Sequence, residues 1–297
     1  MSFRRRLRAL TAQLCWIVLA LVAACGGHSA SPARRALAPT ATVAPEKHRI
    51  VSLIPSLTDD LFAIGAGPQV VAVSAFTSDI PAARNLPRVA DFMSVDVERI
   101  AALRPDLVVG IPPQARLVRP LRRLGIEVAL MPDDTFGDLF NDITRLGELS
   151  GHVAQARALV RRLQAQTRAL HERTRTFRRH PRVFVVLDVA PIWTAGPRSY
   201  LSTLIALAGG RNAVTSLPGA YGEYSAEALL RLQPDVILTD PATHFASVVR
   251  EEPWRSLRAV REGHVIVVDP PEMLERPGPE YVRGLRWLIE RLQPLAQ

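Results

Sequence analysis

The feature that most constrains the fold is a long stretch without glycine or proline near the middle of the chain. Residues 153–178 contain neither residue. Their apolar side chains recur at spacings of three, four and seven: Val153, Ala156, Leu159, Val160, Leu163 and Leu170. This spacing is typical of an amphipathic helix, which at about 1.5 Å per residue would be about 40 Å long. A coiled coil is the alternative, but the apolar stripe covers few heptads. We therefore expect one helical spine between the two halves of the chain.

Short apolar runs alternate with helical patterns on both sides of the spine. Before it, the pattern predicts strands at 49–54, 69–74, 107–110 and 126–131, and helices at 57–64, 94–103 and around 121–124. Ser56 is the expected cap of the helix at 57–64. After the spine, we expect strands at 182–188, 236–239 and 265–268 and helices at 201–208, 225–232 and 281–292. The alternation predicts an α/β protein with two small lobes whose sheets are largely parallel.

One short unit occurs in both halves. Glu98 and Glu227 each stand seven residues before the proline of a Pro-Asp pair, at Pro105 and Pro234. In both halves a helical pattern precedes the pair and a strand pattern follows it. The common register indicates that one lobe is a duplicate of the other.

The beginning of the chain has the features of an export signal. Basic residues from Arg4 to Arg8 precede an apolar run at 14–24, which is too short to span a bilayer as a helix. The following Val22-Ala-Ala-Cys25 resembles a bacterial lipobox and predicts lipidation at Cys25. The alternative is a plain cleaved signal peptide, and the export route, Sec or twin-arginine, stays open. Residues 26–48, rich in Ala, Ser, Pro and Thr, predict a flexible tether. We expect an exported protein anchored to a membrane through lipid alone.

The predicted organisation follows from these patterns. We expect a signal peptide at 1–25, a tether at 26–48, a first lobe at 49–137, a connecting region with the spine at 138–180, and a second lobe at 181–297.

The positive charge does not indicate a nucleic-acid partner. Four of the 37 basic residues precede the apolar run, and without them the net charge falls from +9 to +5. Lys47 is the only lysine, and arginine pairs such as Arg161-Arg162 stand in helical patterns. Charges placed in this way are typical of solvated helix faces.

Motifs of catalysis and metal binding are absent from the sequence. There is no Gly-x-Ser-x-Gly elbow and no glycine-rich phosphate loop before a helix. The seven histidines form no closely spaced pair, and neither cysteine would be a free thiol in a lipidated mature chain. The sequence proposes neither an enzyme nor a metal site.

Taken together, these features resemble the substrate-binding proteins of ABC importers, in the class that carries cobalamin, haem and ferric siderophores. The resemblance covers residues 49–292 and is greatest to the cobalamin-binding branch. It rests on the lobes, the spine and four motifs: residues 49–58, Glu98 with Arg104-Pro105-Asp106, Glu227 with Gln233-Pro234-Asp235, and Trp193-Thr-Ala-Gly196. It implies the class III periplasmic-binding-protein fold, with the ligand between the lobes at the carboxyl ends of the strands.

The resemblance also implies which residues bind the ligand. These are the aromatic residues Phe76, Phe92, Trp193 and Tyr221 and the cation Arg276, which is able to bond amide oxygens or carboxylates. Ile111 departs from the family pattern, because an aromatic residue is usual there. His244, Asp269 and Glu272 are weaker candidates for ligand contact. The expected ligand is a cobalt corrinoid, or otherwise haem or an iron chelate, and the protein needs no cofactor of its own.

The remaining implications concern partners. Glu98 and Glu227 match the positions where the family docks, one glutamate per lobe, on a dimeric permease served by a cytoplasmic ATPase. Their simpler interpretation is an acid in the first turn of a helix, where it complements the helix dipole. We expect a monomer. A sensor or a cofactor-handling enzyme on the same fold remains an alternative.

Overall fold

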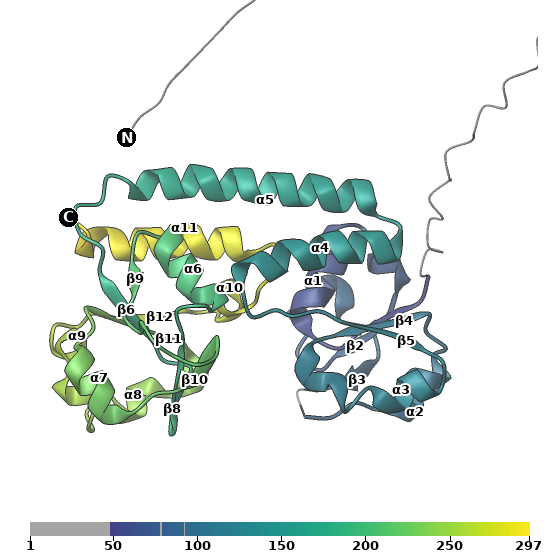
Figure 1. Cartoon of the computed structure of the whole chain (residues 1–297), viewed down its shortest axis with the longest axis horizontal. Helices are drawn as coiled ribbons and strands as arrows, with labels where there is room; N and C mark the ends of the chain where they lie inside the picture. Colours follow the sequence, from purple (N-terminus) through teal and green to yellow (C-terminus); the bar gives the residue numbers. More distant parts are fainter. Residues whose placement is uncertain (1–47, 78, 92) are drawn as a thin grey trace, which may run out of the picture. The chain divides into compact units, whose positions relative to one another are not determined.

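The computed structural model describes residues 48–297 except 78 and 92 (Figure 1). The predicted signal peptide and tether, the lipidation site Cys25 and the ligand residue Phe92 lie outside the described residues. Within the described part of the chain, no helix is both long enough and apolar enough to cross a membrane.

The first lobe is built on a five-stranded parallel sheet in the order β3-β2-β1-β4-β5. Its strands are β1 (Ile50–Ser52), β2 (Val70–Ser74), β3 (Arg88–Ala90), β4 (Leu107–Gly110) and β5 (Glu127–Leu130). One face of the sheet packs against α2 (Val97–Ala102) and α3 (Arg119–Arg123), with Val51 and Val108 in that cluster. The other face, with Ile50 and Val109, packs against α1 (Pro55–Ala63) and α4 (Phe136–Ser150).

The second lobe has a four-stranded parallel sheet in the order β12-β11-β6-β9. Its strands are β6 (Arg182–Val185), β9 (Arg211–Asn212), β11 (Val236–Thr239) and β12 (Val265–Val267). On one face, Phe184 and Ile237 pack against α7 (Ala226–Leu232), α8 (Phe245–Val248) and α9 (Arg258–Arg261). On the other, Val183 and Leu238 pack with α6 (Tyr200–Leu207) and α11 (Tyr281–Leu292). The predicted α/β class with largely parallel sheets is confirmed.

A small antiparallel sheet was not predicted. Its order is β10-β8-β7, formed by β7 (Asp188–Val189), β8 (Ile192–Ala195) and β10 (Tyr221–Glu223). The predicted strand at 182–188 therefore ends at Val185, and the chain turns into this second sheet. Strands this short give little hydrophobic alternation, which is why the sequence did not reveal them.

The spine is α5 (Val153–Thr174), and its 22 residues correspond to a length of about 33 Å. It packs against α4, α6 and α11, and Figure 1 shows α4 and α11 beside it. The apolar side chains of α5, including Leu159 and Leu163, belong to one hydrophobic cluster that also contains Leu57 of the first lobe and Leu204 of the second. The spine is thus part of a core that the two lobes share.

Two local expectations need correction. Helix α1 begins at Pro55 with Ile54 as its cap, and no side chain caps it; Ser56 is buried in the first turn. Proline suits the first position of a helix because it lacks the N–H that would be unpaired there. The connecting region also contains α4, which begins with a reciprocal capping box between Thr135 and Asp138 and ends at Gly151 in the left-handed conformation.

In the first lobe, α2 ends in a compact turn held by polar side chains. The N–H of Arg49 donates to Asp106 Oδ2 at 2.9 Å, and Arg49 Nη2 donates to the carbonyl of Leu103 at 2.7 Å. Arg104, between them, has a left-handed φ of 47°. The arginine that opens β1 thereby satisfies a carbonyl at the end of the helix, and the aspartate satisfies an N–H at the start of the strand.

The second lobe repeats this turn after α7. The N–H of Arg182 donates to Asp235 Oδ2 at 2.7 Å, and Arg182 Nη2 donates to the carbonyl of Leu232 at 2.7 Å. Gln233 has a φ of 44°. Equivalent residues make equivalent bonds in both lobes, which supports the duplication inferred from the Pro-Asp pairs.

Candidate functional site

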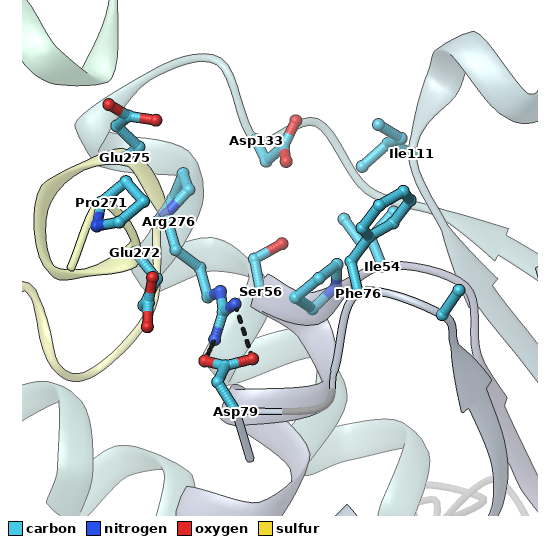
Figure 2. Close-up of a pocket in the computed structure, with 13 residues that line it drawn as sticks. Ile54, Ser56, Phe76, Asp79, Ile111, Asp133, Pro271, Glu272, Glu275 and Arg276 are labelled. Carbon is cyan, nitrogen blue, oxygen red and sulfur yellow. Dashed lines mark hydrogen bonds and ion pairs between the residues drawn. The ribbon is translucent and has the colours of Figure 1, made fainter. Parts of the chain in front are cut away.

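A cavity of about 500 Å³ lies between the two lobes (Figure 2). The first lobe contributes Ile54, Phe76, Ile111 and Asp133, which follow β1, β2, β4 and β5 respectively. The second lobe contributes the segment 271–277, around α10 (Glu272–Glu275). The carboxyl ends of parallel strands meet at one edge of a sheet, so residues far apart in sequence gather there. The location agrees with the expected ligand site.

One wall of the cavity is apolar. Ile54, Phe76 and Ile111 lie together opposite Arg276 in Figure 2. Phe76 is 45% exposed, which is unusual for a large apolar ring. Phe76 was predicted from the sequence as a ligand residue, and the structure places it in the cavity wall. Ile111 lies beside it at the position where an aromatic residue was expected.

The opposite wall contains Arg276, which contacts two carboxylates of the first lobe. Its Nη1 donates to Asp59 Oδ2 at 3.1 Å and to Asp79 Oδ2 at 2.6 Å, and its Nη2 donates to Asp79 Oδ1 at 3.1 Å. The pair with Asp79 is bidentate, a geometry that adds orientation to charge attraction. Arg276 lines the cavity as predicted, and its guanidinium is already engaged across the two lobes.

Apart from Ser56, the remaining polar side chains of the lining are acidic. Burial raises the pKa of Asp133 to about 6, and the neighbouring Asp134 adds to the shift. Burial raises the pKa of Glu275 to about 8, with a further contribution from Asp240. At neutral pH, Asp133 is therefore mostly charged and accepts hydrogen bonds, whereas Glu275 is mostly protonated and shares a side-chain hydrogen bond with Asp240.

Trp193 and Tyr221 lie on the antiparallel sheet of the second lobe. Trp193 of β8 pairs with Glu223 of β10, and Tyr221 of β10 pairs with Ala195 of β8. Directly paired residues share a face, so Trp193 and Tyr221 are diagonal neighbours on one face of the sheet. Trp193 is 38% exposed. Burial raises the pKa of the Tyr221 phenol, and the charge of Asp133 adds to the shift.

The structure thus brings together part of the predicted set. Phe76, Arg276 and Glu272 line the cavity, whereas neither Trp193 nor Tyr221 is among the lining residues. His244 and Asp269 are exposed and do not line it either. Among the residues that the structure describes, no group of three or more His, Cys, Asp or Glu side chains is placed to hold a metal ion.

Sequence reasoning missed the acidic members of the site: Asp59, Asp79, Asp133 and Glu275. For Asp133 a signal was present, because a carboxylate directly after a predicted parallel strand lies at the edge where ligands bind. Asp59 and Asp79 gave no such signal, since their partner Arg276 is 217 and 197 residues away in the chain.

The two predicted docking glutamates occupy equivalent places. Glu98 is the second residue of α2, whose cap Asp96 accepts the N–H of Arg99 at 2.9 Å. Glu227 is the second residue of α7, whose cap Ser225 accepts the N–H of Ala228 at 3.1 Å. Both glutamates are exposed, and neither forms an ion pair within residues 48–297, positions 78 and 92 aside. Both helices cover the sheet faces that do not pack toward α5.

Comparison with known proteins is consistent with this geometry. The family model described as "Periplasmic binding protein" matches residues 50–272. An uncharacterized ABC transporter substrate-binding lipoprotein, YvrC of Bacillus subtilis, is 28% identical over 261 residues, which cover 85% of this chain and 82% of the relative.

Solved structures of periplasmic binding proteins have a similar fold. The periplasmic vitamin B12 binding protein BtuF of Vibrio cholerae is 27% identical with a TM-score of 0.72, over 84% of this chain and 98% of that one. The periplasmic heme-binding protein RhuT of Roseiflexus sp. RS-1 is 24% identical with a TM-score of 0.73, over 84% of this chain and 99% of that one. The similarity to RhuT concerns the fold alone.

Proposed function

Because the chain belongs to the periplasmic binding protein family, we propose that it is the substrate-binding component of an ABC importer and that it captures a corrinoid between its lobes. The relatives at this level of similarity are binding proteins of transporters, not enzymes. The observation that supports the proposal most is the cavity of about 500 Å³ to which both lobes contribute side chains. A ligand held there contacts the two halves of the protein at once.

The lining suits a large ring with uncharged polar side chains. Ile54, Phe76 and Ile111 provide an apolar wall, and aromatic rings offer flat surfaces on the order of 150–250 Å² each. Opposite them, the carboxylate of Asp133 accepts hydrogen bonds. A corrin has a broad apolar ring edged with amides, and each amide both donates and accepts. The two kinds of wall therefore match the two parts of the ligand.

Haem and ferric siderophores are the alternatives. Haem has two propionate groups, and many ferric siderophores are anionic. Among the described residues that line the cavity, acidic side chains outnumber the single cation, Arg276. Like charges repel each other more strongly in a partly buried site than in water. The charge of the cavity thus favours a ligand with amides over a ligand with carboxylates.

The corresponding experiment is a titration of the purified protein with cyanocobalamin, dicyanocobinamide, haemin and a ferric hydroxamate. Binding is followed by tryptophan fluorescence and by visible absorbance of the ligand. We expect the two corrinoids to bind more tightly than haemin. Tighter binding of haemin, or no signal with any of the four ligands, would contradict the proposal.

The anchor and the partners are part of the same proposal. We place the protein outside the cytoplasm, attached to a membrane through lipid on Cys25, and we assign Glu98 and Glu227 to contacts with arginines of a dimeric permease driven by an ATPase. Cys25→Ser should release the protein from the membrane fraction, because a lipid supplies the attachment. Unchanged sedimentation of this variant with membranes would exclude the lipid anchor.

A further inference from the structure

We propose that Asp59 and Asp79 determine the ligand selectivity of the cavity by engaging Arg276. With its guanidinium held by two carboxylates, Arg276 orients the cavity wall but does not attract ligand carboxylates, so the site selects uncharged amides. This inference rests on the proposed function, since it concerns the same cavity. It assigns a role to two residues outside the set that the family resemblance implies.

The geometry of the three side chains supports a fixed arrangement. Asp59 belongs to α1, Asp79 follows β2, and Arg276 follows α10 of the second lobe. Three hydrogen bonds of 2.6 to 3.1 Å join them. The three side chains are only 16%, 20% and 33% exposed for Arg276, Asp59 and Asp79. Shielding from water strengthens such charge-assisted bonds, so they differ from an exposed ion pair of little strength.

Asp59, Asp79 and Arg276 form a triad of charged side chains. The position of this triad explains why its charge matters to a ligand. Asp79 and Arg276 both line the cavity, and Figure 2 shows Arg276 pointing from the second lobe toward Asp79 of the first. On its other side the triad borders a second cavity of about 370 Å³, which contains Asp59 and Glu280. The triad is therefore a wall between two cavities, and a change in its net charge acts directly on the ligand site.

The net charge of the triad has the sign that the selectivity requires. One guanidinium against two carboxylates leaves a surplus of negative charge when both acids are ionised. Burial raises the pKa of Asp59 to about 6, and the charge of Arg276 opposes this shift, so Asp59 is mostly ionised above neutral pH. Glu272, also in the lining, adds a further carboxylate. A ligand carboxylate placed here is repelled by these acids, whereas an arginine without acidic partners would attract it.

The experiment compares two ligands with the same ring. Dicyanocobinamide has amide side chains, whereas dicyanocobyrinic acid has carboxylates at the corresponding positions. Protein purified from membranes in detergent, as cells produce it, is titrated with both at pH 7.5. We expect the wild type to prefer the amide ligand. Asp79→Asn removes one of the two negative charges that neutralise Arg276. It should therefore shift the affinity ratio toward the carboxylate ligand by about tenfold.

Matched variants separate charge from shape. Asp59→Asn should shift the ratio in the same direction, and Asp79→Glu, which keeps the charge, should shift it by less than about twofold. Glu280→Gln removes the same charge in the neighbouring cavity, where the side chain has no hydrogen bond with Arg276, and it should leave the ratio within about twofold. Thermal unfolding of each variant establishes that it is folded.

Each outcome bears on one proposal only. If the wild type binds neither corrin, the proposed function is wrong. If it binds both and the ratio is the same in Asp79→Asn, or if Glu280→Gln shifts the ratio equally, the role of the triad is wrong while the function stands. A wild type that already prefers the carboxylate ligand would show that the ligand displaces Asp79 from Arg276, which also overturns the inference.

Discussion

The two lobes share the turn that ends α2 and α7 and differ in the parts that face the cavity. Arg49 and Asp106 in the first lobe make the same bonds as Arg182 and Asp235 in the second. The first lobe lines the cavity through loops that follow the strands of a parallel sheet. The second lobe lines it through the segment around α10 and also contains an antiparallel sheet that has no counterpart among the described residues of the first.

This difference fits the proposal that the ligand and the permease contact different parts of the molecule. The repeated unit lies on the outer faces and positions Glu98 and Glu227 alike, as a contact with two equivalent partner subunits would require. Among the unrepeated parts, the segment around α10 lines the cavity, where a ligand without twofold symmetry would need different side chains on its two sides. The predictions below test whether the shared and the unshared parts serve separate functions.

The largest effect is expected from the shared part. Glu98→Ala combined with Glu227→Ala should abolish ligand uptake by cells and association with the permease, because each substitution removes a charge-assisted contact. Ligand affinity of the purified double variant should be unchanged, since neither residue lines the cavity. Glu290→Ala, which removes an exposed glutamate of α11, is the control. Wild-type uptake by the double variant would remove the docking assignment.

The next effect is expected from the unshared sheet. Neither ring lines the cavity, so the ligand contact that the family resemblance implies requires a ligand that extends from the cavity to this sheet. In that case Trp193→Ala combined with Tyr221→Ala should weaken corrinoid binding by roughly 3 kcal/mol, the lower end of large aromatic truncations. Binding is measured by titration, and uptake should fall only in proportion to the lost affinity. Leu124→Ala, at a side chain 61% exposed and remote from the cavity, is the control. If the melting transition disappears instead, these rings belong to the core; Tyr221→Phe then tests the hydroxyl alone.

The shared turns should matter about equally to stability. Asp106→Ala and Asp235→Ala each remove the acceptor of a backbone N–H, which costs about 1–3 kcal/mol. Urea unfolding measures the difference from the wild type. Each carboxylate has one further partner, the N–H of His48 for Asp106 and the guanidinium of Arg258 for Asp235, so the two costs should be similar. A cost confined to one lobe would show that the equivalence of the turns is geometric only.

The last effect concerns Asp142, a buried acid of α4. Burial raises the pKa of Asp142 to about 8, with contributions from Asp133 and Asp138. Because the folded state holds this proton more tightly than the unfolded state, the stabilisation is complete below about pH 4 and disappears as the pH rises through 8.

Asp142→Asn resembles the neutral acid and should flatten this dependence. We expect the variant to match the wild type near pH 4 and to become the more stable of the two as the pH rises through 8. Thermal unfolding between pH 4 and 9 measures the difference. A wild type that gains stability over this range would contradict the assignment.

The sequence predicted those parts of the fold that local patterns determine. The helix predicted at 281–292 is α11 with the same bounds, and the predicted spine is α5, which ends at Thr174 rather than near 178. Helix α4 was missed although Thr135, Asp138 and Gly151 provide a start and a stop signal. The antiparallel sheet was missed because its strands are two to four residues long.

The site was less predictable than the fold. Phe76 and Arg276 were identified through the family resemblance, and their place in the cavity agrees with it. That Arg276 would be engaged by Asp59 and Asp79 depends on the packing of one lobe against the other, which no local pattern records. The same holds for Asp60 and Asp142, acids that a sequence pattern assigns to the surface and that the structure buries.

The core that runs from Leu57 through α5 to Leu204 has a consequence for calorimetry. Neither lobe can unfold without uncovering apolar surface of the spine, so heating should give a single transition in which calorimetric and van't Hoff enthalpies agree. Ligand present at 100 times its Kd raises the free energy of unfolding by about 2.7 kcal/mol. A fluorescent probe placed in either lobe should then report the same upward displacement of the midpoint, including a probe far from the cavity.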